Sequence, residues 1–219
     1  MRIAIVCSKY ALEEKNAWLT NELAYAYRDL GHDVIVYCLD WDMKHSGVSY
    51  EDNKGIQVNY LKIPDWIKMF GDSFFLFVKW FLLSWMVKIP VNKKDMSIDL
   101  LIFCSPAITT AGIVHRLKKY AKHTQMILWD FFPIANAELG LIPKKVELIA
   151  KKIEERYINY ADNVGLMSVK NIEFFRDYYR LDNMKLSIVS IWGQESYKLN
   201  QNKINRINRE KINLVFGGQ

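Results

Sequence analysis

Short apolar runs recur along the chain, and a helical pattern follows most of them. Most of these runs are uninterrupted instead of alternating, which is typical of strands that helices cover on both faces of a mostly parallel sheet. Strands that alternate with helices of this length predict a doubly wound α/β fold. The predicted strands are residues 2–7, 33–39, 56–63, 99–104, 125–131, 163–167 and 186–191.

The helices between these runs have recognisable ends. Residues 14–30 carry apolar side chains at helical spacing, and Gly31 follows as a C-cap. A second helix is predicted over 105–122, with Ser105 as its N-cap and Pro106 at the first helical position. The N-terminus of that helix is also a potential anion site. Further helices are predicted over 144–160 and 169–180.

The amino-acid composition of the chain changes near its end. Residues 1–190 are predicted to form one α/β domain, and the polar, Asn- and Lys-rich stretch 191–211 is predicted to be a linker. Residues 212–216 then read "INLVF", a buried-strand pattern, and the turn Gly217–Gly218 follows. A strand that enters a Gly-Gly turn commonly opens a βα unit, so residues 212–219 are predicted to begin a second α/β domain, and the chain is expected to be a fragment.

Charge and cysteine content narrow the partners and the compartment. The formal net charge of +6 fits an acidic partner such as a nucleotide, a phospholipid surface or a nucleic acid. The three cysteines are widely spaced and lie near apolar runs, so we expect buried thiols in an intracellular protein and no disulfide framework. The N-terminus does not have the pattern of a signal peptide. The sequence has no GxGxxG, P-loop, HExxH or GxSxG motif and no visible metal-ligand cluster, so no metal site is predicted.

Polar side chains follow several of the predicted strands. Because ligands bind beyond the carboxyl ends of parallel strands, these positions predict a cleft. Lys9 follows the first strand, Ser105 the fourth, Asp130 the fifth and Ser168 the sixth. Asp130 stands in "LWDFFP" and needs solvent, a hydrogen-bond partner or a function at the end of a buried strand.

Residues 66–90 form the most unusual stretch, because aromatic and aliphatic side chains crowd it. As a helix, residues 74–89 would span roughly 24 Å, less than the ~30 Å hydrocarbon core of a bilayer. Two alternatives remain: a helix buried inside the domain, or a helix that lies on a membrane surface. The predicted membrane contacts are Phe74, Phe77, Trp80, Phe81 and Trp85.

Five segments in this order resemble the N-terminal half of bacterial glycosyltransferases of the GT-B type, which have two Rossmann-like domains facing a cleft. They are "MRIAIVCSKY", "NELAYAYRDLGHDVIVYCLD", "LLIFCSPAITTAGIVHRLKK", "MILWDFFPIANAELGLI" and "YADNVGLMSVKNIEFFRDYY". The final "KINLVFGGQ" is similar to the start of the C-terminal domain of that family. The likeness is strongest to the retaining enzymes of capsule, exopolysaccharide and O-antigen synthesis.

The resemblance implies specific roles for residues of this chain. Asp130 is the predicted catalytic residue, and Gly217 and Gly218 would lie near the donor diphosphate. Some relatives carry a sugar-binding histidine after the fourth strand, where this chain has Cys104 or Ser105. The predicted substrate-binding residues are Lys9, Asn16, Ser105 and Ser168.

The resemblance also implies an activity. The intact enzyme would move a sugar from a UDP- or GDP-linked donor to a polyprenyl-diphosphate-linked acceptor, while bound peripherally to the inner face of the cell membrane in the cytoplasm. No nucleic-acid partner and no cofactor beyond the nucleotide-sugar co-substrate are expected, and the fragment alone is expected to be inactive. Two alternatives are an enzyme similar to nucleotide-sugar 2-epimerases and a non-catalytic membrane-binding α/β module.

Overall fold

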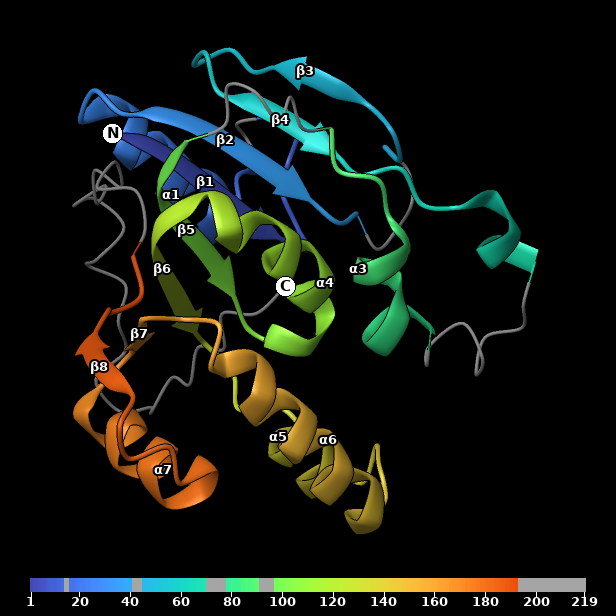
Figure 1. The fold of residues 1–219 in the computed structure, drawn as a ribbon, viewed down its shortest axis with the longest axis vertical. Helices are drawn as coiled ribbons and strands as arrows, with labels where there is room; N and C mark the ends of the chain where they lie inside the picture. Colours follow the sequence, from blue (N-terminus) through green and yellow to red (C-terminus); the bar gives the residue numbers. More distant parts are fainter. Residues whose placement is uncertain (14–15, 41–44, 70–77, 91–96, 193–219) are drawn as a thin grey trace, which may run out of the picture.

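An eight-stranded sheet forms the centre of the fold in the computed structural model, which describes residues 1–13, 16–40, 45–69, 78–90 and 97–192 (Figure 1). The strand order is β3-β4-β2-β1-β5-β6-β7-β8, and every pairing is parallel except that of β3 with β4. The strands are β1 (Arg2–Cys7), β2 (Asp33–Cys38), β3 (Ser49–Glu51), β4 (Gln57–Tyr60), β5 (Ile98–Cys104), β6 (Ala121–Leu128), β7 (Asn163–Leu166) and β8 (Lys185–Ile188).

Helices cover both faces of this sheet, with α1 and α4 on opposite sides (Figure 1). The α-helices are α1 (Leu19–Asp29), α3 (Leu83–Met86), α4 (Ala107–Leu117), α5 (Ile134–Glu138), α6 (Lys144–Ile158) and α7 (Val169–Tyr179). Shorter helical turns are η2 (Asp65–Met69), η3 (Val78–Leu82) and η4 (Lys118–Tyr120).

The core explains why the strands are apolar without interruption. Successive side chains of a strand point to opposite faces of the sheet, so a strand covered on both faces needs apolar residues throughout. In β1, Ile3 and Ile5 belong to the same buried cluster as Tyr25 of α1. Their neighbours Ala4 and Val6 belong to the cluster on the other face, together with α4 and α7. The predicted α/β fold class, a mostly parallel Rossmann-like sheet, is confirmed.

Several elements differ from the sequence prediction, among them α1, which begins at Leu19, and the short helix α5, which was not predicted. The helix predicted over 105–122 ends at Leu117, and β6 begins at Ala121 because its polar first residues pair with the buried strand β5. The antiparallel edge strand β3 was not predicted, since "SYE" is short and has no apolar run. The stretch 66–90 is not one helix in its described parts, which comprise η2, η3 and α3.

Helix α4 packs directly on the backbone of the segment that contains α3. A Cβ atom on Gly112 would lie 2.6 Å from backbone atoms of Ser84 and Trp85. The Gly112 N–H donates to Ser84 Oγ over 3.1 Å. The Arg116 guanidinium donates to the carbonyl oxygens of Ser84 and Val87 over 2.6 and 2.7 Å. Close main-chain packing and hydrogen bonds between side chains and the main chain therefore hold α4 against the α3 segment.

We expect the Gly112→Ala substitution to lower the free energy of unfolding by about 1–3 kcal/mol, because the added methyl group overpacks this contact. An alanine at an unpacked helix position would instead raise stability by about 0.5–1 kcal/mol, because it removes the entropic cost of glycine. Urea unfolding of both proteins measures the sign of the change. A stabilised variant would mean that α4 does not contact residues 84–85 in solution.

Candidate functional site

A cavity of about 710 Å³ opens at the carboxyl ends of β1, β2, β5 and β6, where the sequence analysis placed a cleft. Its volume is within the range of roughly 300–1,000 Å³ that is usual for small-molecule sites. Its lining is mainly apolar and aromatic, with a few polar groups. The polar and charged residues of the lining are Ser8, Lys9, Asp40, His45, Ser105, Asp130 and Asn136.

Three tryptophans from separate segments line this cavity. Trp18 precedes α1, Trp80 lies in η3, and Trp129 follows β6. Each ring is partly buried, and Trp80 packs on Phe132 with ring centroids 4.7 Å apart. Lys9 Nζ lies 3.8 Å from the centre of the Trp18 ring. Rings that are held in place and partly exposed offer flat apolar faces to a ligand.

The loop after β1 is shaped by Asn21, a fully buried residue of α1 that the sequence analysis missed. Asn21 Oδ1 accepts hydrogen bonds from the N–H groups of Ala11 and Trp18 at 2.9 and 3.0 Å. Asn21 Nδ2 donates to the Ala11 carbonyl oxygen over 2.9 Å. Both bonded residues line the cavity, so Asn21 is a positioning residue. A polar residue on the inward face of an amphipathic helix is the signal that could have found it.

Ser105 lines the cavity, but it does not cap α4 as predicted. Its Oγ accepts hydrogen bonds from the N–H groups of Trp129 and Asp130 at 3.0 and 3.2 Å. The helix begins one residue later, with Pro106 at the N-cap position. The N-cap prediction for Ser105 is wrong because its hydroxyl binds the turn after β6 instead. Ser105 thus joins the ends of β5 and β6 and positions Asp130.

Glu154 occupies the position at α4 that the sequence analysis assigned to an anionic ligand. This residue of α6 is 1% exposed, and its Oε1 and Oε2 each accept a hydrogen bond over 2.7 Å, from the N–H groups of Ala107 and Ile108. Burial raises the pKa of Glu154 to about 8, and the two backbone hydrogen bonds oppose that rise. The predicted anion site at this helix N-terminus is therefore filled by the protein itself.

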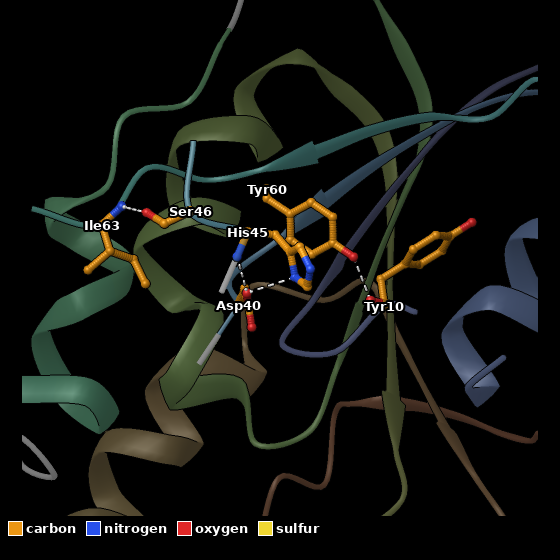
Figure 2. A network of polar contacts seen from close by, with 6 residues as sticks. All are labelled: Tyr10, Asp40, His45, Ser46, Tyr60 and Ile63. Carbon is orange, nitrogen blue, oxygen red and sulfur yellow. Dashed lines mark hydrogen bonds and ion pairs between the residues drawn. The ribbon is translucent and has the colours of Figure 1, made fainter. Parts of the chain in front are cut away.

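Asp40 and His45 form a polar pair on the cavity wall (Figure 2). His45 Nδ1 lies 3.3 Å from Asp40 Oδ2, and the His45 N–H donates to the same oxygen over 2.9 Å. The His45 ring also lies against Tyr60, with centroids 5.1 Å apart. The next residue, Ser46, accepts a hydrogen bond from the Ile63 N–H over 2.8 Å. The end of β4 therefore holds this loop in place.

Asp40 directly follows the second predicted strand, but neither it nor His45 is among the site residues that the sequence analysis named. No motif signals this histidine, because the contact depends on how residues 45–48 return along β4. The histidine that the family resemblance led us to seek after the fourth strand is absent at Cys104 and Ser105. A histidine nevertheless reaches the cavity, from the loop after β2.

Asp130 stands at the junction of two cavities. A second cavity of about 510 Å³ shares Trp129, Asp130, Phe131 and Ala135 with the first. Lys170 and Asn171 at the start of α7 line its far side. Asp130 is solvent-exposed, and its carboxylate has no partner among the residues that the structure describes. The two cavities together extend the site from β1 to α7.

Other predicted site residues lie elsewhere. Asn16 is exposed and donates to Glu13 outside the cavity lining. Ser168 is the N-cap of α7 and accepts from the Asn171 N–H over 3.2 Å. Phe81 is partly buried against Ile108 and Ala150, whereas Trp85 is 38% exposed. Four predicted residues lie outside the described part of the chain: Phe74, Phe77, Gly217 and Gly218.

The three cysteines are buried free thiols, as expected. Burial raises the pKa values of Cys38 and Cys104 well above the usual value, so these thiols stay protonated at neutral pH. In the described ranges, no group of three or more His, Cys, Asp or Glu side chains could hold a metal ion. Across the same ranges, no helix has both the length and the apolar character needed to cross a bilayer.

Comparison with known proteins supports the fold. No family model matches the chain, and a search of curated proteins finds no match. The solved structure of sucrose-phosphate synthase (tll1590) from Thermosynechococcus elongatus is similar, with a TM-score of 0.55 and 9% sequence identity. That protein is a glycosyltransferase of the GT-B fold. The similarity covers 86% of this chain and 47% of the synthase, so this chain corresponds to about half of its length. At this identity the similarity establishes the fold alone.

Proposed function

We propose that the chain is the acceptor-side domain of a retaining GT-B glycosyltransferase. The intact enzyme would transfer a sugar from a UDP- or GDP-linked donor to a polyprenyl-diphosphate-linked saccharide in surface polysaccharide synthesis. It would work at the inner face of the cell membrane, and it would need no cofactor besides the nucleotide sugar. The similarity of the fold to part of a glycosyltransferase is consistent with this proposal.

The cavity at the strand ends is the observation that carries the proposal. Sugars present apolar C–H faces and a rim of hydroxyl groups, so a saccharide site needs flat aromatic surfaces beside hydrogen-bonding groups. The cavity supplies both: Trp18, Trp80 and Trp129 offer ring faces, and Asp130 and the Asp40–His45 pair offer hydrogen-bond partners. The adjoining second cavity leaves room for a further sugar residue.

We assign different roles to the polar groups of this site. Asp130 would accept a hydrogen bond from the reacting part of the acceptor, with Ser105 as its positioning residue. The Asp40–His45 pair would orient another acceptor hydroxyl, because a carboxylate beside imidazole Nδ1 fixes the ring and its tautomer. Lys9 would contact the acceptor near Trp18. A second domain after residue 211 would hold the donor, with Gly217 and Gly218 near its diphosphate.

The Asp130→Ala substitution in the full-length protein is expected to lower kcat/KM for transfer at least tenfold, equivalent to ~1.4 kcal/mol of lost transition-state stabilisation. The physical reason is the loss of an exposed carboxylate at the junction of two cavities. The measurement is transfer of a radiolabelled sugar from UDP- and GDP-sugars to a polyprenyl-diphosphate saccharide. Asp177→Ala, which removes an exposed carboxylate of α7 outside both cavities, is the control and should stay within twofold of the unmodified protein.

Three results would contradict this assignment. Activity of the Asp130→Ala variant within twofold of the unmodified protein would make Asp130 structural. Epimerisation of the sugar nucleotide without transfer would favour an enzyme similar to 2-epimerases. Binding to membranes without any turnover would favour a non-catalytic module.

A further inference from the structure

The solvent-facing side of α6 combines apolar and basic side chains and carries no exposed carboxylate. The helix runs obliquely through the lower part of the molecule, and its last residue, Ile158, packs in the core of the sheet (Figure 1). A helix surface in contact with water alone normally carries acidic as well as basic residues. Seven of the fifteen residues of α6 are exposed: Lys144, Lys145, Val146, Leu148, Ile149, Lys152 and Arg156.

The acidic residues of α6 are all turned toward the protein. Glu147 is buried, pairs with Lys144 and accepts a hydrogen bond from Tyr178 OH over 3.0 Å. Glu154 is buried at the N-terminus of α4. Glu155 is half-buried, 3.7 Å from Lys151. The three carboxylates of the helix are thus used inside the domain, and the outer side keeps the positive charges of Lys145, Lys152 and Arg156.

Large apolar side chains stand among these charges and continue into the turn before the helix. Leu148 and Ile149 are 52% and 63% exposed. In the turn, Leu139 and Leu141 are 73% and 68% exposed. Single exposed leucines are common on proteins, but several large apolar side chains exposed within residues 139–149, beside basic ones, indicate an interaction surface.

We propose that this surface lies on an anionic lipid bilayer. We name it the α6 surface and define it as Leu139, Leu141, Lys145, Leu148, Ile149, Lys152 and Arg156. A helix with apolar and basic side chains on one side and few acidic ones is suited to the interface, where the apolar groups enter the headgroup region and the cations face anionic lipids. Neither a second copy of this basic surface nor a basic partner offers the same charge complementarity.

The position of the α6 surface fits the proposed acceptor site. Helix α5 directly precedes the turn that holds Leu139 and Leu141, and its Ala135 and Asn136 line the main cavity. Ring centroids of Trp85 and Tyr157 lie 6.2 Å apart, so α6 also adjoins the segment for which membrane contact was predicted. On the basis of the proposed function, the lipid part of an acceptor would stay in the bilayer, close to the mouth of the cavity.

Vesicle sedimentation tests the charge requirement. The chain should bind vesicles of phosphatidylglycerol and phosphatidylcholine but not vesicles of phosphatidylcholine alone, and salt should weaken binding. The K145Q/K152Q variant should bind at least tenfold more weakly. The matched control R176Q/R180Q removes two exposed charges from α7 and its C-cap and should bind like the unmodified chain. Equal loss in both variants would mean that net charge alone attracts the protein, and would overturn the assignment to α6.

A probe at position 149 tests insertion of the apolar side chains. Because the native cysteines are buried, Ile149→Cys can be labelled selectively with a polarity-sensitive dye. Its emission should shift to the blue on anionic vesicles and be quenched by brominated lipids. An unshifted dye on bound protein would overturn the proposal. So would self-association that depends on concentration and is lost in the Leu148→Ser, Ile149→Ser double variant, because the occupant would then be a second copy.

The same double variant separates this proposal from the proposed function. It should retain transfer to a water-soluble acceptor analogue and lose at least tenfold in transfer to an acceptor embedded in anionic vesicles. Equal transfer to both acceptors would overturn the lipid assignment and leave the glycosyltransferase function intact. If neither protein transfers sugar, the vesicle and dye measurements still decide the lipid proposal, because they use no acceptor or donor.

Discussion

Replacing Glu154 with alanine is expected to lower the free energy of unfolding by about 3–5 kcal/mol. The substitution leaves the N–H groups of Ala107 and Ile108 buried without an acceptor, at about 1–3 kcal/mol each, and it adds a small void. Glu154→Gln should have a smaller effect, because its amide keeps one acceptor oxygen. Urea unfolding followed by circular dichroism measures both changes.

The neighbouring residue provides the control for this experiment. Glu155→Ala removes a half-buried carboxylate that forms a 3.7 Å ion pair with Lys151, so it should cost less than about 1 kcal/mol. A loss of less than 1 kcal/mol for Glu154→Ala would show that water replaces the carboxylate at the start of α4.

The stability of the domain is expected to fall relative to that of the Glu154→Gln variant as the pH rises from 4.5 to about 8. Burial raises the pKa of Glu154 from 4.5 to about 8, so the folded protein holds this proton more tightly than the unfolded chain does. The contribution is fully present below pH 4.5 and is lost as the pH rises through about 8. The change should be on the order of a few kcal/mol.

Parallel urea titrations of the two proteins across this range isolate the Glu154 contribution. Other groups titrate equally in both proteins, including Glu147, whose pKa the Lys144 ion pair lowers. A difference in unfolding free energy that does not vary with pH would mean that Glu154 stays ionised throughout.

The sheet could be predicted from the sequence because its signal is local. Each central strand is buried on both faces, so its composition alone identifies it. The edge strand β3 has one partner and little burial, and "SYE" therefore looks like a loop. The start of β6 is polar and becomes a strand only because β5 lies beside it. Both segments are strands because each pairs with a neighbouring strand, and a local sequence pattern does not reveal such pairing.

The site could be predicted only in part, because a local sequence pattern identifies only the residues that directly follow a strand. The strand-end rule located Lys9, Ser105 and Asp130 at the cavity. It did not reveal that the Ser105 hydroxyl binds the turn after β6, or that Glu154, 47 residues beyond Ala107, caps α4. His45 and Asn21 were missed because each acts through a contact made by the folded loop. The hydrogen-bond partners of these polar groups depend on the tertiary structure.

The carboxylate at the start of α4 also decides how this domain can recognise a substrate. In many α/β proteins the first helix turn beside the ligand cleft holds a phosphate through free N–H groups. Here the N–H groups of Ala107 and Ile108 already donate to Glu154, so they are not available to a phosphate. In the proposed function, recognition in the cavity would thus rely on its tryptophan rings and on the side chains of Lys9, Asp130 and the Asp40–His45 pair. If a phosphorylated substrate binds here, this domain would contact its sugar. Groups other than the N-terminus of α4 would have to neutralise its phosphates.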